Sequence, residues 1–301
     1  MTHSAIERRI FIVGVPRSGT TLVQSLLASH TAMTSFTESH FFRKNFSRVP
    51  LLSLPILTRD PRSRLYEFLA ENGEEPPPAA EWFAESERWP LRVRPLLPFQ
   101  TLPVARQLVR VLDEIALKRG AINWIEKTPW HLRFISLLER ASPGRRPHFI
   151  HVIRNGLEVV ASLHRASRQW ERSYDLESCV ARWNGDLEHS LNRISSPNDQ
   201  FVAYEQLTSD PEGTVKRLLD GLGLAWEPSI LERYGSASEK FITAREDWKN
   251  GVGRRIHRSA TSAEVLTPEQ TEWVTARLDH DLYDRILDRS GGPKGSTSGA
   301  A

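Results

Sequence analysis

The sequence predicts an α/β fold of three layers, with a sheet of parallel strands between two layers of helices. Two observations support this prediction. Short apolar or β-branched runs at residues 10–13, 149–153 and 201–204 are each followed by a helical pattern, and a fourth run covers residues 122–126. Because strands that alternate with helices are joined by crossover connections, we expect them to pair in parallel and to be buried on both faces.

Each of the first three runs leads into a helix of its own. Apolar residues three and four positions apart mark these helices. The third helix is expected to begin at Asp210-Pro211, since proline suits the first turn, and to end at Gly223. The apolar residues of the three patterns are Leu22, Val23, Leu26 and Leu27; Leu157, Val160 and Ala161; and Val215, Leu218, Leu219 and Leu222.

Residues 41–120 differ from the rest of the chain, because prolines and aromatic residues are frequent in them. Two helical patterns, around Leu65 and around Leu108, are separated by long irregular loops. Such loops in a compact protein are usually lids or binding segments, so we expect a substrate lid; a helical insertion that only packs on the sheet is the alternative. Residues 1–290 are expected to form one domain that includes this insertion, and the small polar residues 291–301 a disordered tail.

The composition argues against several classes of protein. Of the 301 residues 40 are basic and 37 acidic, and a net charge of +3 is too small to indicate a nucleic-acid partner. A single cysteine, Cys179, cannot form an intramolecular disulfide, and no ligand spacing for zinc is found, so no metal is expected. Nowhere do about 18 apolar residues run together, so we expect no membrane span and a cytoplasmic location.

The most informative segment runs from Ile10 to Leu22, where a strand enters a glycine-containing turn that opens directly into a helix. In this arrangement successive backbone N–H groups and the helix dipole converge on one point, which favours a phosphate or sulfate group. The candidate anion-binding residues are Arg17, Ser18, Gly19, Thr20 and Thr21.

This loop lacks one residue of the nucleotide-binding phosphate loop, GxxxxGK[ST]. Gly14 and Gly19 have the required spacing, but Thr20 stands where that loop has its lysine. Enzymes that use nucleoside triphosphates need this lysine at the β- and γ-phosphates, together with a carboxylate-held magnesium ion. Here the cation is Arg17, inside the loop. A P-loop kinase or NTPase is therefore the less favoured alternative.

A second candidate anion site follows residues 149–153. Arg154 stands at the end of this run, and Ser162 lies eight residues later on the predicted helix. A guanidinium at a strand end and a hydroxyl two helical turns later can converge on one dianion.

These motifs resemble those of sulfotransferases that use 3′-phosphoadenosine 5′-phosphosulfate (PAPS). Residues 15–22, Val-Pro-Arg-Ser-Gly-Thr-Thr-Leu, are similar to the loop that holds the 5′-phosphosulfate, in the arginine form of the tyrosylprotein sulfotransferases and their bacterial relatives. The resemblance implies a P-loop-type fold, PAPS as cofactor and sulfuryl donor, Arg154 and Ser162 at its 3′-phosphate, and Tyr204 near its adenosine. It covers residues 9–40 and 122–290.

The resemblance also implies three catalytic residues. Lys127 follows a predicted strand and so belongs to the same sheet edge as both anion sites, where it would stabilise the transition state together with Arg17. Glu38, 21 positions after Arg17, would act as the general base. His40 is the alternative base, because residues two apart on an extended segment face the same side.

One signature of the family's cytosolic branch is missing, the arginine-lysine-glycine motif near the C-terminus that binds the 3′-phosphate. Residues 245–255 form a basic loop punctuated by glycines instead, in which Trp248 and Lys249 are the expected cofactor contacts. Arg165 and Arg168 are both candidates for a second arginine at this phosphate.

The resemblance implies an acceptor hydroxyl on a small molecule, a lipid, a glycan or a peptide. A homodimer is one option for the assembly. A non-catalytic nucleotide-binding protein on the same fold is the third functional hypothesis, beside the sulfotransferase and the P-loop kinase or NTPase.

Overall fold

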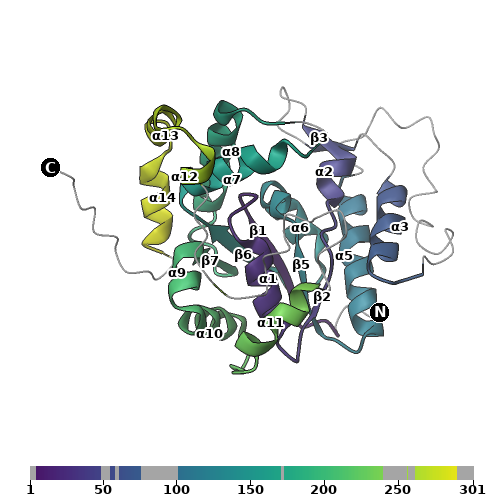
Figure 1. Cartoon of the computed structure of the whole chain (residues 1–301). Coiled ribbons are helices and arrows are strands. Elements are labelled where there is room, and N and C mark those ends of the chain that lie inside the picture. Colours follow the sequence, from purple (N-terminus) through teal and green to yellow (C-terminus); the bar gives the residue numbers. More distant parts are fainter. Residues whose placement is uncertain are drawn as a thin grey trace, which may run out of the picture.

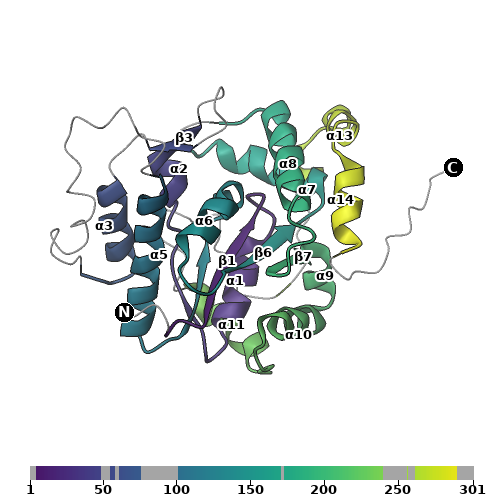
Figure 2. The same cartoon turned by 180° about the vertical axis from the view of Figure 1, so that it is seen from behind.

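A parallel sheet of five strands lies at the centre of the fold, in the order β2-β5-β1-β6-β7. The computed structural model describes residues 5–48, 55–57, 61–75, 101–170, 173–239, 256 and 262–289. The strands are β1 (Arg8–Gly14), β2 (Thr34–Ser35), β5 (Asn123–Lys127), β6 (His148–Ile153) and β7 (Asp199–Ala203). Helices cover both faces of this sheet (Figures 1 and 2), so the predicted α/β fold is confirmed.

The four predicted runs all form strands, with small shifts at their ends. Lys127 is the last residue of β5 and does not follow it. Tyr204 was predicted to end a strand, but β7 ends at Ala203 and Tyr204 opens a helix. The sequence did not predict β2, which has only two residues and is too short to show an alternating pattern.

The alternation of side chains along β1 explains why the sheet is covered on both faces. Ile10 and Ile12 point to one face, Phe11 and Val13 to the other, and all four are fully buried. β5 and β6 pair with β1 on its two edges. The central strand therefore has neither an exposed face nor an unpaired edge.

Each face has its own set of helices. The Ile10 face carries α1 (Thr20–Ala28), α9 (Tyr204–Ser209), α10 (Pro211–Leu222) and α11 (Ile230–Glu239). The Phe11 face carries α5 (Thr101–Lys118), the 3₁₀-helix η2 (Pro129–Phe134) and α6 (Ile135–Ala141), the last of which lies in front of the sheet in Figure 2. The α10 boundaries agree with the prediction, because Pro211 is in its first turn and Gly223 ends it with φ 66°.

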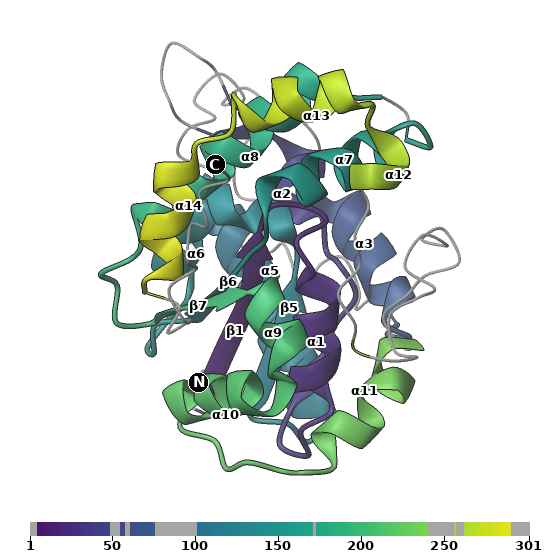
Figure 3. The same ribbon diagram turned by 60° about the vertical axis from the view of Figure 1, so that its left-hand side comes forward.

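A third group of helices packs against the β6–β7 side of the sheet. It consists of α7 (Gly156–Ser167), α8 (Leu176–Leu191), α12 (Ser262–Val265), α13 (Pro268–Thr275) and α14 (His280–Leu287). Figure 3 shows α12 and α13 beside α7. Asn155 caps the N-terminus of α7, where its side chain accepts a hydrogen bond from the Glu158 amide.

Residues 41–120 contribute α2 (Phe41–Asn45), the antiparallel pair β3 (Phe46–Arg48) and β4 (Pro55–Leu57), α3 (Pro61–Glu71) and α5. The helical patterns predicted around Leu65 and Leu108 are both confirmed as helices. The apolar side of α5 packs into the core beside α6. The predicted cofactor contacts Trp248 and Lys249 and the predicted tail 291–301 lie outside the described residues. Among the helices of the described ranges, none combines the length and hydropathy that crossing a bilayer requires.

Replacing Gly14 by alanine should lower the free energy of unfolding by about 3 kcal/mol or more. Gly14 has φ +141°, and a Cβ atom there would lie 2.3 Å from the carbonyl oxygen of Val152 on β6. Gly73→Ala is the matched control, because Gly73 has φ +71° but a Cβ there would meet no described atom within 4 Å. The control should cost only about 1–2 kcal/mol. Urea denaturation measures the free energy of unfolding of both variants. Equal decreases would contradict the clash with Val152 as the cause.

Candidate functional site

The predicted functional residues gather at the carboxyl edge of the sheet. All strand pairs of the sheet are parallel, so β1, β2, β5, β6 and β7 end at the same edge. The phosphate loop follows β1, the segment with Glu38 follows β2, and Lys127 ends β5. Arg154 follows β6, and Tyr204 follows β7. Ligands of open α/β sheets bind at this edge, so topology alone brings the motifs together.

The phosphate loop has the backbone geometry of an anion site. Among the described residues only two other than glycine have positive φ, Arg17 at 74° and His40 at 47°, and both belong to the candidate site. Such strained conformations cluster at functional sites. Gly19, with φ 98°, is the N-cap of α1 and provides no capping side chain, so the first amides of the helix are left for a ligand.

Ser18 adds a further polar group to the loop. Its side chain is fully buried, and its hydroxyl has no hydrogen-bond partner among the described residues. Leaving a buried hydroxyl without a partner costs about 1–3 kcal/mol. A bound anion beside the loop would supply the missing acceptor.

The two predicted anion sites are joined to each other. Arg17 Nε donates a hydrogen bond to Ser162 Oγ at 3.1 Å, and Arg154 Nη1 donates to the Arg17 carbonyl oxygen at 3.2 Å. Arg154 is 5% exposed, and its Nη2 lies 3.7 Å from the Glu158 carboxylate. Two guanidinium groups from the loops after β1 and β6 and one hydroxyl from α7 therefore form one cationic cluster.

Tyr204 packs against both Arg154 and Gly19 of the phosphate loop. The Arg154 Cζ atom is 4.3 Å from the centre of the Tyr204 ring, a cation–π contact. A Cβ atom on Gly19 would come within 2.5 Å of the same ring. The ring therefore packs the loop against Arg154, and a larger residue at position 19 would displace it.

Glu38, Lys127 and His40 form a second cluster. Lys127 Nζ forms a short ion pair with Glu38 Oε1, and His40 Nε2 lies 3.5 Å from Glu38 Oε2. The side chain of Lys127 is 1% exposed, that of Glu38 12% and that of His40 35%. Glu38 thus lies between the buried ammonium and the more exposed imidazole, and the structure brings together both candidate bases and the predicted lysine.

A buried network beneath Glu38 was not predicted from the sequence. Glu126 on β5 accepts hydrogen bonds from the Ser39 amide at 3.0 Å and from the Thr128 hydroxyl, and its Oε2 lies 2.9 Å from His131 Nδ1. Burial acts to raise the pKa of the Glu126 carboxyl, but His131 and these two hydrogen bonds outweigh burial and lower that pKa. A carboxylate next to Trp124-Ile125 in a predicted strand was the available signal, because buried carboxylates are nearly always paired.

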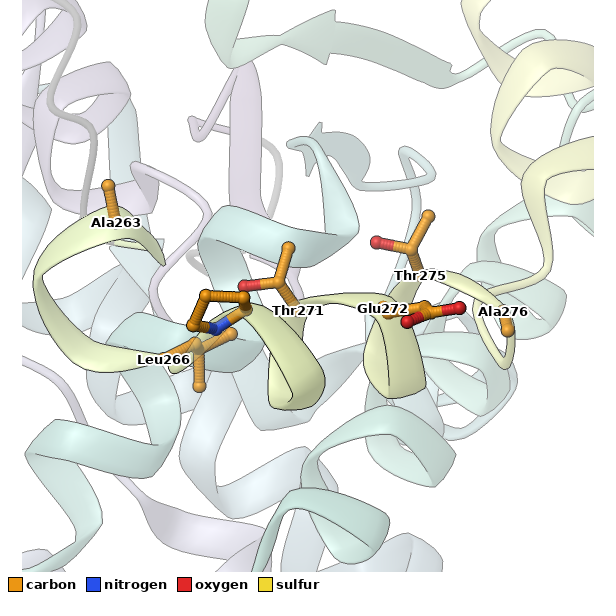
Figure 4. Close-up of a pocket in the computed structure, with 7 residues that line it drawn as sticks. Ala263, Leu266, Thr271, Glu272, Thr275 and Ala276 are labelled. Carbon is orange, nitrogen blue, oxygen red and sulfur yellow. The ribbon is translucent and has the colours of Figure 1, made fainter.

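The candidate second arginines have other contacts. Arg165 is exposed and forms an ion pair with Glu264 on α12, and Arg168 donates a hydrogen bond to His164. A hollow of about 720 Å³ lies along α12 and α13, but none of its lining residues was predicted for the site (Figure 4). They are Ala263, Leu266, Pro268, Thr271, Glu272, Thr275 and Ala276.

Curated proteins of similar sequence include protein-tyrosine sulfotransferases. Over 230 residues the chain is 27% identical to protein-tyrosine sulfotransferase 1 of Danio rerio, covering 74% of this chain and 55% of that protein. It is also 27% identical over 294 residues to the protein-tyrosine sulfotransferase of Drosophila melanogaster, covering 93% of this chain and 48% of that protein. The chain thus spans about half the length of these relatives.

A solved structure shares the fold of this chain, and a family model gives its family. The sulfotransferase domain of the olefin synthase of Synechococcus PCC 7002 superposes with a TM-score of 0.53 at 16% identity, over 90% of this chain and 94% of that one. At this identity the likeness shows the shared fold. The model of the Sulfotransferase family matches residues 9–228, which include the phosphate loop with Arg17, as well as Glu38, Lys127, Arg154 and Tyr204. The chain therefore belongs to the sulfotransferase family.

Proposed function

We propose that this protein transfers a sulfuryl group from PAPS to a hydroxyl group of an acceptor. The observation that supports the proposal best is the pairing of two clusters at one sheet edge. One is the Arg17–Ser162–Arg154 cluster, which can neutralise a donor with two anionic ends. The other is the Glu38–Lys127 pair, which combines a base with a cation.

The residues at the sheet edge fit PAPS. Arg17 and the backbone of residues 18–21 would hold the 5′-phosphosulfate, and Arg154 with Ser162 would hold the 3′-phosphate. The buried Ser18 hydroxyl, which has no partner among the described residues, supports this assignment. So does the turn at Gly14 and Gly19, where the close contacts leave no room for a Cβ atom. When bound, the donor supplies the sulfuryl group and a phosphate leaving group.

In this proposal the side chains divide the chemical work. Glu38 accepts the proton of the acceptor hydroxyl, so that the oxygen can attack sulfur. Lys127 and Arg17 neutralise the negative charge that develops as the sulfur leaves the phosphate oxygen. His40 lies on the exposed side of Glu38 and would face the acceptor.

We also propose that the segment after His40 contributes to the acceptor side. α2 begins at Phe41, directly after the candidate bases, so residues 41–120 start at the point where the acceptor must bind. This is the position that a substrate lid would need.

Incubation with ³⁵S-labelled PAPS and a cell extract, in the presence of a metal chelator, should give labelled acceptor products that mass spectrometry can identify. Calorimetry in the same buffer should show binding of 3′-phosphoadenosine 5′-phosphate (PAP). The chelator matters because arginines and backbone amides, not a metal ion, are proposed to neutralise the donor. Absence of PAP binding would contradict the proposal, and magnesium-dependent ATP turnover would favour the kinase or NTPase alternative.

A further inference from the structure

The short segment that carries Glu38 is held by side chains from several other elements. We call residues 36–40 the Glu38 loop. Side chains of residues far away in the sequence bind the backbone of each of its five residues. Three backbone carbonyls accept hydrogen bonds from side chains: that of Phe36 from Gln24, and those of Glu38 and Ser39 from Arg64. Three backbone amides donate to side chains: that of Thr37 to Asn72, that of Ser39 to Glu126, and that of His40 to Thr128.

Arg64 on α3 makes the two contacts nearest to the proposed base. Its Nε donates to the Ser39 carbonyl oxygen at 2.5 Å, and its Nη2 donates to the Glu38 carbonyl oxygen at 3.0 Å. Arg64 is 2% exposed. The carboxylates of Glu67 and Glu71 on the same helix hold the guanidinium from its other side, at 2.9–3.0 Å. Arg64 is therefore fixed by its own helix and presents a rigid fork of donors to the loop.

Glu126 binds the same loop from the sheet. The Ser39 amide donates to Glu126, and the Ser39 carbonyl oxygen accepts from Arg64. Two buried charged side chains therefore bind the backbone of the residue next to Glu38. Glu126 and Lys127 are neighbours on β5, and alternation along the strand turns their side chains to opposite faces. One strand thus supplies the cation that pairs with Glu38 and the anion that binds the amide of the next residue, Ser39.

We propose that Arg64 and Glu126 are positioning residues that hold the Glu38 carboxylate against Lys127. This inference rests on the proposed role of Glu38 as the general base. It adds to that role the residues that fix the position of the base. The left-handed backbone of His40 supports the inference, because a strained conformation persists only where the surroundings enforce it. It also gives α3, within residues 41–120, a part in the site: this helix holds the segment that carries the base.

Arg64→Lys tests the proposal, and Arg9→Lys is its matched control. Arg9 is equally buried, pairs with Asp113, and donates to the backbone carbonyls of Pro143 and Arg145, and none of these three partners belongs to the Glu38 loop. A lysine lacks the planar fork of five donors with which Arg64 binds two carbonyls and two carboxylates together. In the labelled-PAPS assay with the acceptors of a cell extract, Arg64→Lys should lower the transfer rate about 10–100-fold. Its Kd for PAP should stay within about twofold of the wild type, whereas Arg9→Lys should change neither quantity.

Two further measurements separate positioning from general structural support. Hydrogen exchange of a peptide that covers residues 36–42 should be faster in Arg64→Lys than in Arg9→Lys, because only the former releases the loop. In a Glu38→Gln background, Arg64→Lys should cause no further loss of rate, since its effect acts through Glu38. If Arg64→Lys does not fold, Glu126→Gln is compared with Asp199→Asn, which alters an equally buried carboxylate–histidine pair with His151. Glu126→Gln should then lower the rate, and Asp199→Asn should not.

The outcomes distinguish this inference from the proposed function. If Glu38→Gln keeps the wild-type rate of transfer, Glu38 is not the general base, and the proposed function is wrong in assigning it that role. If Glu38→Gln loses activity while Arg64→Lys or Glu126→Gln keeps it, only the positioning role is overturned. Additive losses of Arg64→Lys and Glu38→Gln would overturn it as well. The hydrogen-exchange measurement needs neither sulfuryl donor nor acceptor. Unchanged exchange at residues 36–42 in Arg64→Lys would therefore count against the positioning role even where no sulfuryl transfer is detected.

Discussion

Replacing Glu38 by glutamine should lower the rate of sulfuryl transfer about 10³-fold and leave the Kd for PAP within about twofold. Glutamine keeps the size of the side chain but cannot accept the proton of the acceptor hydroxyl. The cationic cluster of Arg17, Ser162 and Arg154 is untouched, so donor binding should persist. Single-turnover transfer from labelled PAPS measures the rate, and calorimetry measures PAP binding.

His40→Asn is the comparison that decides between the two candidate bases. His40 Nε2 lies 3.5 Å from Glu38 Oε2, so removal of the imidazole should alter the rate much less than removal of the carboxylate. Glu232→Gln, a change on the surface helix α11, controls for loss of a negative charge. A larger loss in His40→Asn than in Glu38→Gln would assign the base to His40.

The phosphate loop could be predicted from the sequence because its geometry is local. A buried strand, a glycine turn and a helix follow one another between Arg8 and Ala28, and each leaves its own mark on the sequence. The same holds for Arg154, which directly follows β6, and Ser162, which lies on the next helix, α7. Where a site depends on one strand-to-helix connection, residue order is enough to place its parts.

The direct contact between Glu38 and Lys127 could not be predicted in this way. It depends on β2, which pairs with β5 through Thr34 and Ser35 only. A strand of two residues has no pattern to detect, yet it fixes the segment with Glu38 beside the strand with Lys127. The sequence placed both residues in the site through separate motifs, but their pairing is a product of strand order.

The network beneath Glu38 is harder still to find in a sequence. Its members come from α3, β5 and η2, and no local pattern connects Ser39 with Arg64, Glu126 and His131. Arg64 lies in an ordinary amphipathic helix, where a single arginine usually faces solvent. Its burial, and the carbonyls that it binds, follow from tertiary packing alone.

Replacing Arg154 by alanine should raise the Kd for PAP about 100-fold or more. A charged hydrogen bond to a phosphate contributes about 1.5–3 kcal/mol, and Arg154 is proposed to supply two of them to the 3′-phosphate. The substitution also removes the cation–π contact with Tyr204 and the donor to the Arg17 carbonyl, so the phosphate loop loses a support. Calorimetric titration with PAP in chelator measures the change.

Two controls show whether the loss of affinity belongs to the 3′-phosphate. Arg233→Ala removes a half-exposed arginine that pairs with Glu227 on the surface, and PAP should bind this variant like the wild type. Adenosine 5′-phosphosulfate lacks the 3′-phosphate, so wild type and Arg154→Ala should bind it with affinities that differ much less than those for PAP. Because the proposed contact is with that one phosphate, an equal loss for both ligands would mean that Arg154 acts mainly by supporting the loop at Arg17. Unchanged PAP binding in Arg154→Ala would place the 3′-phosphate elsewhere at the sheet edge and contradict the assignment.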